Sequence, residues 1–239
     1  MNNRHAIVTW YTIIKAHVLD ICFPPVCVHC KKLISAQEKF LCDTCLEQVE
    51  TYNALYCPAC GARRPAYNPC HREAIYLLAP ACAYSGPIVS LIHAYKYAYV
   101  RDIEKILSAL AIAHLSSLAM PLNAYTIVPI PLFPSRQRRR GFNQSLLIAQ
   151  RIADHFHIPC QELLARTKAT QPQARQQNAH TRAANVAGCF SLVPGASVAG
   201  KKILLVDDVS TSGATLHEAS AVLAAHGAQH IIAAVIARA

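Results

Sequence analysis

The chain has 239 residues, enough for one large domain or for a small domain followed by a medium one. Its hydrophobic content of 53% is ample for a core. Its formal net charge of +10 favours polyanionic partners such as nucleic acid, pyrophosphate groups or an acidic membrane surface, with a solvated basic face as the alternative. No segment contains the roughly 20 consecutive apolar residues that span a bilayer, so no integral membrane segment is expected.

The most apolar stretch near the N-terminus covers residues 6–23. It contains Lys15, His17 and Asp20 and lacks a small-residue cleavage site, which argues against a signal peptide. We expect an amphipathic helix that packs on the rest of the protein. A peripheral contact with the inner membrane is the alternative.

Eleven cysteines occur in the chain, and six of them form three C-x2-C pairs near the N-terminus. The first two pairs are separated by eleven residues, a spacing typical of a tetrahedral thiolate site for zinc. Without a signal peptide, such pairs in turn-rich sequence favour a metal over disulfides or thioredoxin-like chemistry. The predicted ligands of this zinc ribbon are Cys27, Cys30, Cys42 and Cys45.

A second site has three clear ligands, Cys57, Cys60 and Cys70, but position 73, where a fourth cysteine would be expected, is Glu. His71 would complete a Cys₃His site for Zn²⁺, which is the interpretation favoured here. Ligation by Glu73 and loss of the second metal are the alternatives.

Residues 1–78 are predicted to form an N-terminal helix and zinc-ribbon module, which needs metal because so small a segment builds too little core. In residues 79–239, helical and strand patterns alternate, which predicts an α/β fold with a mostly parallel sheet and helices on both faces. Helices are expected at residues 86–97, 102–118, 146–156 and 214–226, and strands at residues 125–128, 202–207 and 230–237.

An unbroken apolar run at residues 203–206 is typical of a strand buried on both faces, and Asp207 and Asp208 follow it. A turn of small hydroxyl residues and one glycine then leads into a helix. Ligands of open α/β sheets bind at the carboxyl ends of strands, and backbone N–H groups at a helix N-terminus favour an anion. Because sugar hydroxyls donate hydrogen bonds to carboxylates, the pattern predicts a sugar phosphate held at both ends, against the alternative of a capped turn without a ligand.

A basic loop is expected at residues 131–144, between a strand and a helix. Its arginines match phosphate oxygens with paired hydrogen bonds, so Arg139, Arg140 and Gly141 are candidates for a pyrophosphate site, and Asn143 is a candidate N-cap. A general nucleic-acid patch is the alternative. Lys96 either approaches phosphate or lies on a helix surface.

Residues 166–187 are rich in polar side chains and lack apolar periodicity, so we expect a mobile loop. Closure of this loop as a lid would exclude water from a hydrolysable substrate, with Gln173, Arg182 and Asn185 reaching inward. A disordered polar loop is the alternative.

Residues 203–216 resemble the phosphoribosyl pyrophosphate (PRPP) motif of type I phosphoribosyltransferases. The resemblance implies that Asp207 and Asp208 contact the ribose hydroxyls and that the following turn holds the 5′-phosphate. The residues implied in that turn are Ser210, Thr211, Ser212, Gly213, Ala214 and Thr215. Further residues expected to reach PRPP are Arg139, Arg140, Gly141, Lys96, Gln173 and Arg182.

Taken in order, the zinc knuckles, residues 91–97, the Arg-Arg-Gly-Phe-Asn-Gln block at 139–144, the 173–190 loop and the PRPP motif resemble the competence protein F family. This implies a type I phosphoribosyltransferase-like parallel sheet flanked by helices, with an N-terminal zinc-ribbon module. It also implies a role in natural transformation, in which the protein handles incoming single-stranded DNA on the cytoplasmic side.

Two functions are therefore expected. In an enzyme, Mg²⁺ would bridge the pyrophosphate and ribose of PRPP, and Asp207, Asp208 and Arg140 would be catalytic, although no acceptor-binding motif is evident. In a non-catalytic adaptor, the same fold would sense PRPP or bind single-stranded DNA, with a helicase or another DNA-uptake protein as partner.

Overall fold

The computed structural model describes residues 24–35, 40–64, 70–71, 74–98, 100–118, 120–168 and 186–239. The amphipathic helix expected at residues 6–23 lies outside this part of the chain. So do Glu73 and the three residues of the expected lid, Gln173, Arg182 and Asn185.

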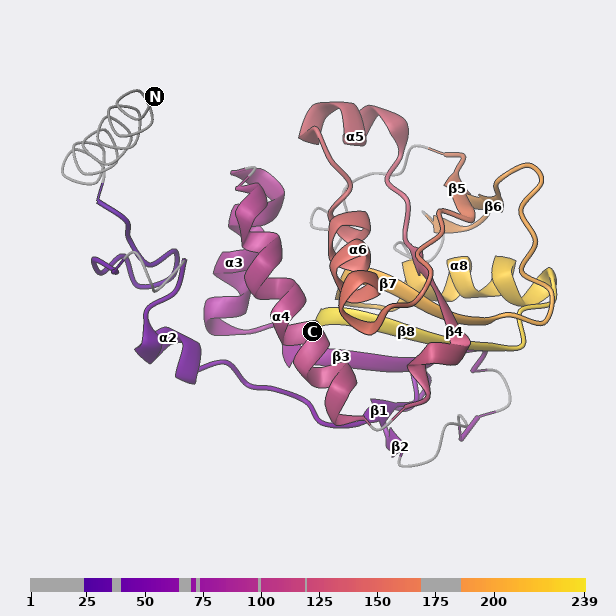
Figure 1. Cartoon of the computed structure of the whole chain (residues 1–239), viewed down its shortest axis with the longest axis horizontal. Coiled ribbons are helices and arrows are strands. Elements are labelled where there is room, and N and C mark those ends of the chain that lie inside the picture. Colours follow the sequence, from indigo (N-terminus) through magenta and orange to yellow (C-terminus); the bar gives the residue numbers. More distant parts are fainter. Residues whose placement is uncertain are drawn as a thin grey trace, which may run out of the picture.

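The architecture is α/β, as predicted, and is built on one six-stranded sheet with the order β2-β1-β3-β8-β7-β4. Its four main strands run parallel to one another. They are β3 (Leu77–Ala83), β8 (His230–Arg238), β7 (Lys202–Ser210) and β4 (Tyr125–Pro129). Figure 1 shows β3, β7 and β8 side by side in the middle of the molecule.

Strand β7 explains the unbroken apolar run in the sequence. Ile203, Leu204 and Leu205 are all fully buried, because both faces of the strand are covered. The strand continues through both acids to Ser210, three residues beyond its predicted end, and β4 likewise extends to Pro129, which pairs with Val206. The two acids therefore belong to the strand and share its rigidity.

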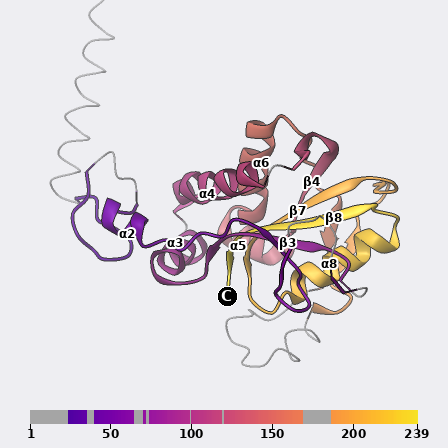
Figure 2. The ribbon, with the colours of Figure 1, turned by 90° about the horizontal axis from the view of Figure 1, so that it is seen from below.

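Helices cover both faces of the sheet, as Figure 2 shows with α4 and α6 on one side and α8 on the other. One face packs against α3 (Gly86–Tyr97), α4 (Glu104–Ser117) and α6 (Gln144–Phe156). The other packs against α8 (Ala214–Ala225) and a separate hairpin of β5 (Leu164–Arg166) and β6 (Phe190–Leu192). Short 3₁₀ helices at Arg101–Ile103 and Leu122–Ala124 precede α4 and β4.

The prediction of a basic loop at residues 131–144 is wrong in part, because helix α5 (Pro134–Arg140) forms within this segment. Proline at the first turn and arginines after it are compatible with a helix. No residue of α5 is buried, so the helix has no apolar face from which periodicity could reveal it.

The two knuckles attach to the body differently. The first includes α2 (Asp43–Glu47) and lies beside α3, where His29 Nδ1 and Ser90 Oγ are 3.0 Å apart. The second lies between β1 (Leu55–Tyr56) and β2 (Arg63–Arg64), and β1 pairs antiparallel with β3. The second knuckle is therefore an extension of the main sheet. None of the described helices is long and apolar enough to cross a membrane.

Candidate functional site

A cavity of about 350 Å³ lies at the carboxyl ends of β4 and β7, walled by α3, α5 and α6. It brings together the acid pair, the arginine block and Lys96, which are far apart in the sequence. The charged residues that line it are Lys96, Arg136, Arg139, Arg140, Arg166, Asp207 and Asp208. Side chains of both charges therefore line one cavity.

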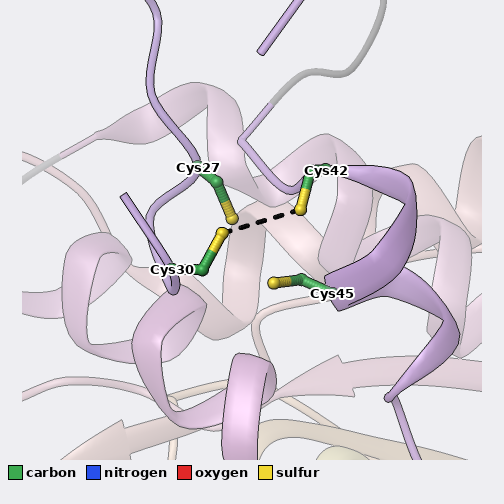
Figure 3. A group of neighbouring side chains, drawn as sticks. All are labelled: Cys27, Cys30, Cys42 and Cys45. Atoms are coloured by element: carbon green, nitrogen blue, oxygen red, sulfur yellow. Dashed lines mark hydrogen bonds between the residues drawn. The ribbon is translucent and has the colours of Figure 1, made fainter. Parts of the chain in front are cut away.

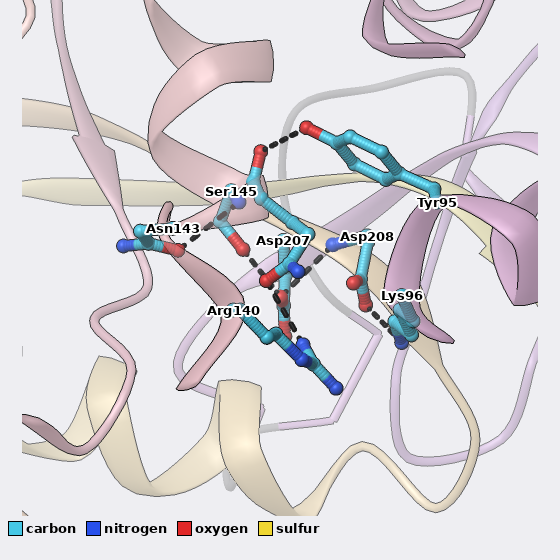
Figure 4. A network of polar contacts seen from close by, with 8 residues as sticks. Tyr95, Lys96, Arg140, Asn143, Ser145, Asp207 and Asp208 are labelled. Carbon is cyan, nitrogen blue, oxygen red and sulfur yellow. Dashed lines mark hydrogen bonds and ion pairs between the residues drawn. The ribbon is translucent and has the colours of Figure 1, made fainter. Parts of the chain in front are cut away.

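The two acids are held by different helices (Figure 4). Lys96 Nζ of α3 donates to Asp208 Oδ1 at 2.8 Å. Ser145 Oγ of α6 donates to Asp207 Oδ1, also at 2.8 Å, and the backbone N–H of Asp208 donates to the same oxygen at 2.9 Å. Sequence reasoning missed Ser145, because nothing near it in the chain indicates its distant partner.

The environment shifts the proton affinity of this cluster. Burial and the adjacent charge of Asp208 raise the pKa of Asp207 to about 6, although Lys96 and the hydrogen bonds act in the opposite direction. Burial acts to lower the pKa of Lys96, but the charge and hydrogen bond of Asp208 outweigh it and raise that pKa. Lys96 is therefore an ammonium ion that lies beside the acid pair.

The start of α6 positions the acid-binding serine. Asn143 Oδ1 accepts a hydrogen bond from the backbone N–H of Ser145 at 3.2 Å, which confirms Asn143 as the N-cap. Asn143 Nδ2 donates to Ile130 O at 3.1 Å. Arg140 Nη1 donates to Gln144 Oε1 at 2.9 Å, and Tyr95 Oη donates to Gln144 O at 3.2 Å. These hydrogen bonds connect α3, α5 and α6 around the cavity.

Four arginines concentrate positive charge in the lining of the same cavity. Burial lowers the pKa of Arg136, and its neighbours Arg166, Arg140 and Arg139 lower it further. Arg166 was expected at the start of a mobile loop, but it ends β5 and its Cζ lies 5.2 Å from the ring centre of Phe190. Four crowded guanidinium groups repel one another, and an anion between them would relieve that repulsion.

The predicted phosphate turn joins β7 to α8. Thr211 and Thr215 line the cavity, and Gly213 is the N-cap of α8 with φ +72°. The N-terminus of α8 adds backbone N–H groups that favour an anion. The other predicted members of the turn are Ser210, Ser212 and Ala214, and Gly141 follows the last residue of α5.

The first cysteine cluster matches the geometry of zinc. All four sulfur atoms lie within 4.8 Å of one another, and Cys30 Sγ and Cys42 Sγ are 3.7 Å apart (Figure 3). A tetrahedron with Zn–S bonds of about 2.3 Å has edges of about 3.8 Å. The predicted Cys₄ set, completed by Cys27 and Cys45, therefore fits Zn²⁺.

In the second cluster His71 lies beside the three cysteines, at the place that the favoured interpretation gives to the fourth ligand. The ligand atoms of Cys57, Cys60, Cys70 and His71 lie within 4.8 Å of one another. His71 Nδ1 is 3.6 Å from Cys57 Sγ and 3.2 Å from Cys70 Sγ. One imidazole and three thiolates form a common structural zinc set.

Both knuckles use the same backbone turn. The N–H of Lys31 donates to Cys27 O at 3.0 Å, and the N–H of Gly61 donates to Cys57 O at 2.8 Å. Burial acts to raise the pKa of Cys27, but hydrogen bonds from nearby backbone N–H groups outweigh it and lower that pKa to about 6; the same balance lowers the pKa of Cys57 to about 6. Thiolates are the form that binds metal.

Two parts of the chain match known protein families. Residues 18–82 match the family described as "Double zinc ribbon domain", and residues 143–239 match "Phosphoribosyl transferase domain". The first match spans both ligand clusters, and together they indicate zinc.

Full-length relatives are also similar. The chain is 30% identical over 216 residues to "Competence protein F" of Haemophilus influenzae and 31% identical over 221 residues to "DNA utilization protein YhgH" of Escherichia coli K12. Each alignment covers 86% of this chain and 93% of the relative. "Competence protein ComFC" of Bacillus subtilis is 25% identical over 206 residues, covering 82% of both chains.

Proposed function

This chain belongs to the competence protein F family, and from that premise we propose that it is a PRPP-binding phosphoribosyltransferase-like protein that acts in DNA uptake. In this proposal it handles incoming single-stranded DNA in the cytoplasm. The names of its relatives and the phosphoribosyltransferase domain support the role in uptake. The ligand is proposed from the chemistry of the cavity.

One observation carries the proposal: a single cavity is lined both by the two adjacent acids of β7 and by four arginines. Ribose hydroxyls donate hydrogen bonds to carboxylates such as Asp207 and Asp208. Guanidinium groups such as Arg139 and Arg140 match the oxygens of a pyrophosphate. A ligand with a sugar at its centre and phosphates at both ends would offer hydroxyls to the two acids. Its phosphates would bind the arginines at one end and the turn before α8 at the other.

Lys96 and Ser145 prepare the acid pair for that ligand. Lys96 offsets the repulsion between two adjacent carboxylates, and Ser145 orients Asp207 by a hydrogen bond. Mg²⁺ carried with PRPP fits the same acids, because it prefers carboxylate, phosphate and water oxygens, and it would neutralise pyrophosphate charge. Asp207, Asp208 and their phosphate partners are the residues that would hold it.

The same arrangement suits phosphoribosyl transfer to an acceptor. In that reaction class, positive charge develops on the ribose as its bond to pyrophosphate breaks. The fixed charge of Asp207 and Asp208 would stabilise the ribose, and Arg140 would take the departing pyrophosphate. Both acids lie on a rigid strand, so little reorganisation is needed when the charge develops.

A second candidate function, direct binding of single-stranded DNA, is favoured by helix α5. This helix carries four arginines and buries none of its residues. Arg138 is exposed and does not belong to the residues lining the cavity. Arg138 and Arg139 are the exposed arginines of this helix and would contact a phosphate backbone. In the adaptor version of the proposal, this surface and a helicase or another uptake protein would act together.

Transformation frequency tests the proposal in cells. The chromosomal copy is replaced by Asp207→Asn/Asp208→Asn, or by Asp154→Asn as a control at an exposed acid outside the cavity. We expect at least a tenfold loss for the double variant and none for the control. Wild-type frequency in the double variant, at equal protein levels, would show that uptake does not need this site.

A further inference from the structure

Arg238 connects the second zinc knuckle to the strand that carries the phosphate turn. It is the last residue of β8 and pairs with Ser210, the last residue of β7. Its Cζ lies 5.3 Å from the ring centre of Tyr56, which directly precedes Cys57. The side chain therefore reaches from the edge of the phosphate turn to the knuckle.

Gly61 in that knuckle leaves room for the guanidinium group. A Cβ atom at Gly61 would lie 2.8 Å from Arg238 Nη2, closer than non-bonded atoms approach. The equivalent turn position of the first knuckle is occupied by Lys31, with φ of 64°. The turn itself therefore accepts a side chain, and the special property of Gly61 is its contact with Arg238.

Tyr76 lies beside the phosphate turn itself. It is buried just before β3, and a Cβ atom at Gly213 would lie 3.2 Å from its hydroxyl oxygen. Burial raises the pKa of Tyr76 to about 12, and the charge of Arg238 acts against this shift. The hydroxyl of Tyr76 therefore lies against the phosphate turn and within electrostatic reach of Arg238.

We propose that the second zinc knuckle holds the phosphate turn in its binding conformation, with Arg238 and Tyr76 as the positioning residues between them. This inference rests on the proposed function, in which the turn binds the 5′-phosphate of PRPP. A turn that is already ordered loses less conformational entropy when the ligand binds. The contact therefore raises the affinity for PRPP. The first knuckle packs on α3 through His29 and Ser90 instead.

Gly61→Ala is the direct test, because the added methyl group displaces the Arg238 guanidinium. Gly200→Ala is the matched control, since Gly200 has the same φ of +72° but no atom within 4 Å of its added Cβ. Both proteins are prepared full-length with zinc bound. Hydrogen exchange of residues 211–216 without ligand is measured first, followed by calorimetric titration with Mg²⁺–PRPP.

We expect Gly61→Ala to accelerate exchange in the turn and to weaken PRPP binding at least fivefold relative to Gly200→Ala. Arg238→Gln and Tyr76→Phe should accelerate exchange in the same residues, and Cys60→Ser should do so while losing one zinc per chain. Equal exchange in Gly61→Ala and Gly200→Ala would overturn the inference. If the wild type fails to bind PRPP, the proposed function fails, whereas the exchange comparison still decides the coupling.

Discussion

Lys96 Nζ in the last turn of α3 lies 2.8 Å from Asp208 Oδ1 near the end of β7, although 112 positions separate the two residues. Their side chains are only 20% and 10% exposed. The ion pair therefore connects a helix of the body to the acid pair in a place where solvent screens it poorly. It is the contact that makes two adjacent carboxylates tolerable inside the cavity.

Lys96→Met should weaken both folding and ligand binding, because it leaves Asp208 without its cation next to Asp207. We expect a loss of about 1–3 kcal/mol in the free energy of unfolding and at least tenfold weaker PRPP binding at neutral pH. Urea denaturation and calorimetry measure the two effects. Lys105→Met is the control, since its ion pair with Asp102 is largely exposed and is worth less than about 1 kcal/mol. Similar losses in the two variants would contradict the role given to Lys96.

The raised pKa of Asp207 predicts a particular pH dependence of stability. Its folded-state value of about 6 lies above the ordinary value, so between these two values the folded protein binds more protons than the unfolded one. Stability contributed by this group is therefore lost as the pH rises toward and through 6. Asp207→Asn removes the effect and should unfold with a flatter pH profile.

The measurement is the change in unfolding free energy between pH 5.0 and pH 7.5, compared between wild type and Asp207→Asn. The comparison removes contributions from other titrating groups. We expect the two changes to differ by about 1–2 kcal/mol, since each pKa unit corresponds to about 1.4 kcal/mol and part of the shift is screened by solvent. Parallel profiles would show that Asp207 titrates normally.

Zinc content tests the fourth ligand of the second knuckle. The two ligand clusters predict two zinc ions per chain, and His71→Ala should reduce that number to one. His157→Ala, at an exposed histidine outside both clusters, should keep both ions. Atomic absorption on purified protein gives the count. If His71→Ala still holds two zinc ions, another residue supplies the fourth ligand.

Arg138 separates DNA binding from PRPP binding. If α5 contacts the phosphate backbone, Arg138→Ser should reduce the salt dependence of single-stranded DNA binding by about one unit of slope. PRPP affinity should stay within twofold of wild type, because Arg138 lies outside the residues that line the cavity. Fluorescence anisotropy over a salt series measures the slope. An unchanged slope would exclude this surface from DNA contact.

The part of the site that can be predicted from sequence is the part that is contiguous in the chain. The β7 strand, its acids and the turn before α8 follow one another. Their hydrophobic pattern and their side-chain chemistry can therefore be interpreted together. The N-cap at Asn143 can be predicted for the same reason, because it directly precedes its helix. The arginines of α5 were recognised, but their helix was not, since it has no apolar face.

The partners made by folding could not be predicted in the same way. Ser145 lies 62 positions from Asp207, and Arg166 joins the cavity only because β5 pairs with β6. The contact of Arg238 with the second knuckle depends on the order of strands in the sheet. The spacing of the cysteines predicts all four ligands of the first knuckle, whereas for the second it favours His71 but leaves alternatives for the fourth ligand.

Calorimetric titration of Mg²⁺–PRPP into zinc-loaded wild type and into Asp207→Asn/Asp208→Asn tests the central claim most directly. We predict saturable binding to one site per chain in the wild type and none in the double variant, with equal zinc content in both. A folded, zinc-loaded wild type that releases no heat of binding, or a double variant that binds as tightly as wild type, would contradict a sugar-phosphate site at the end of β7.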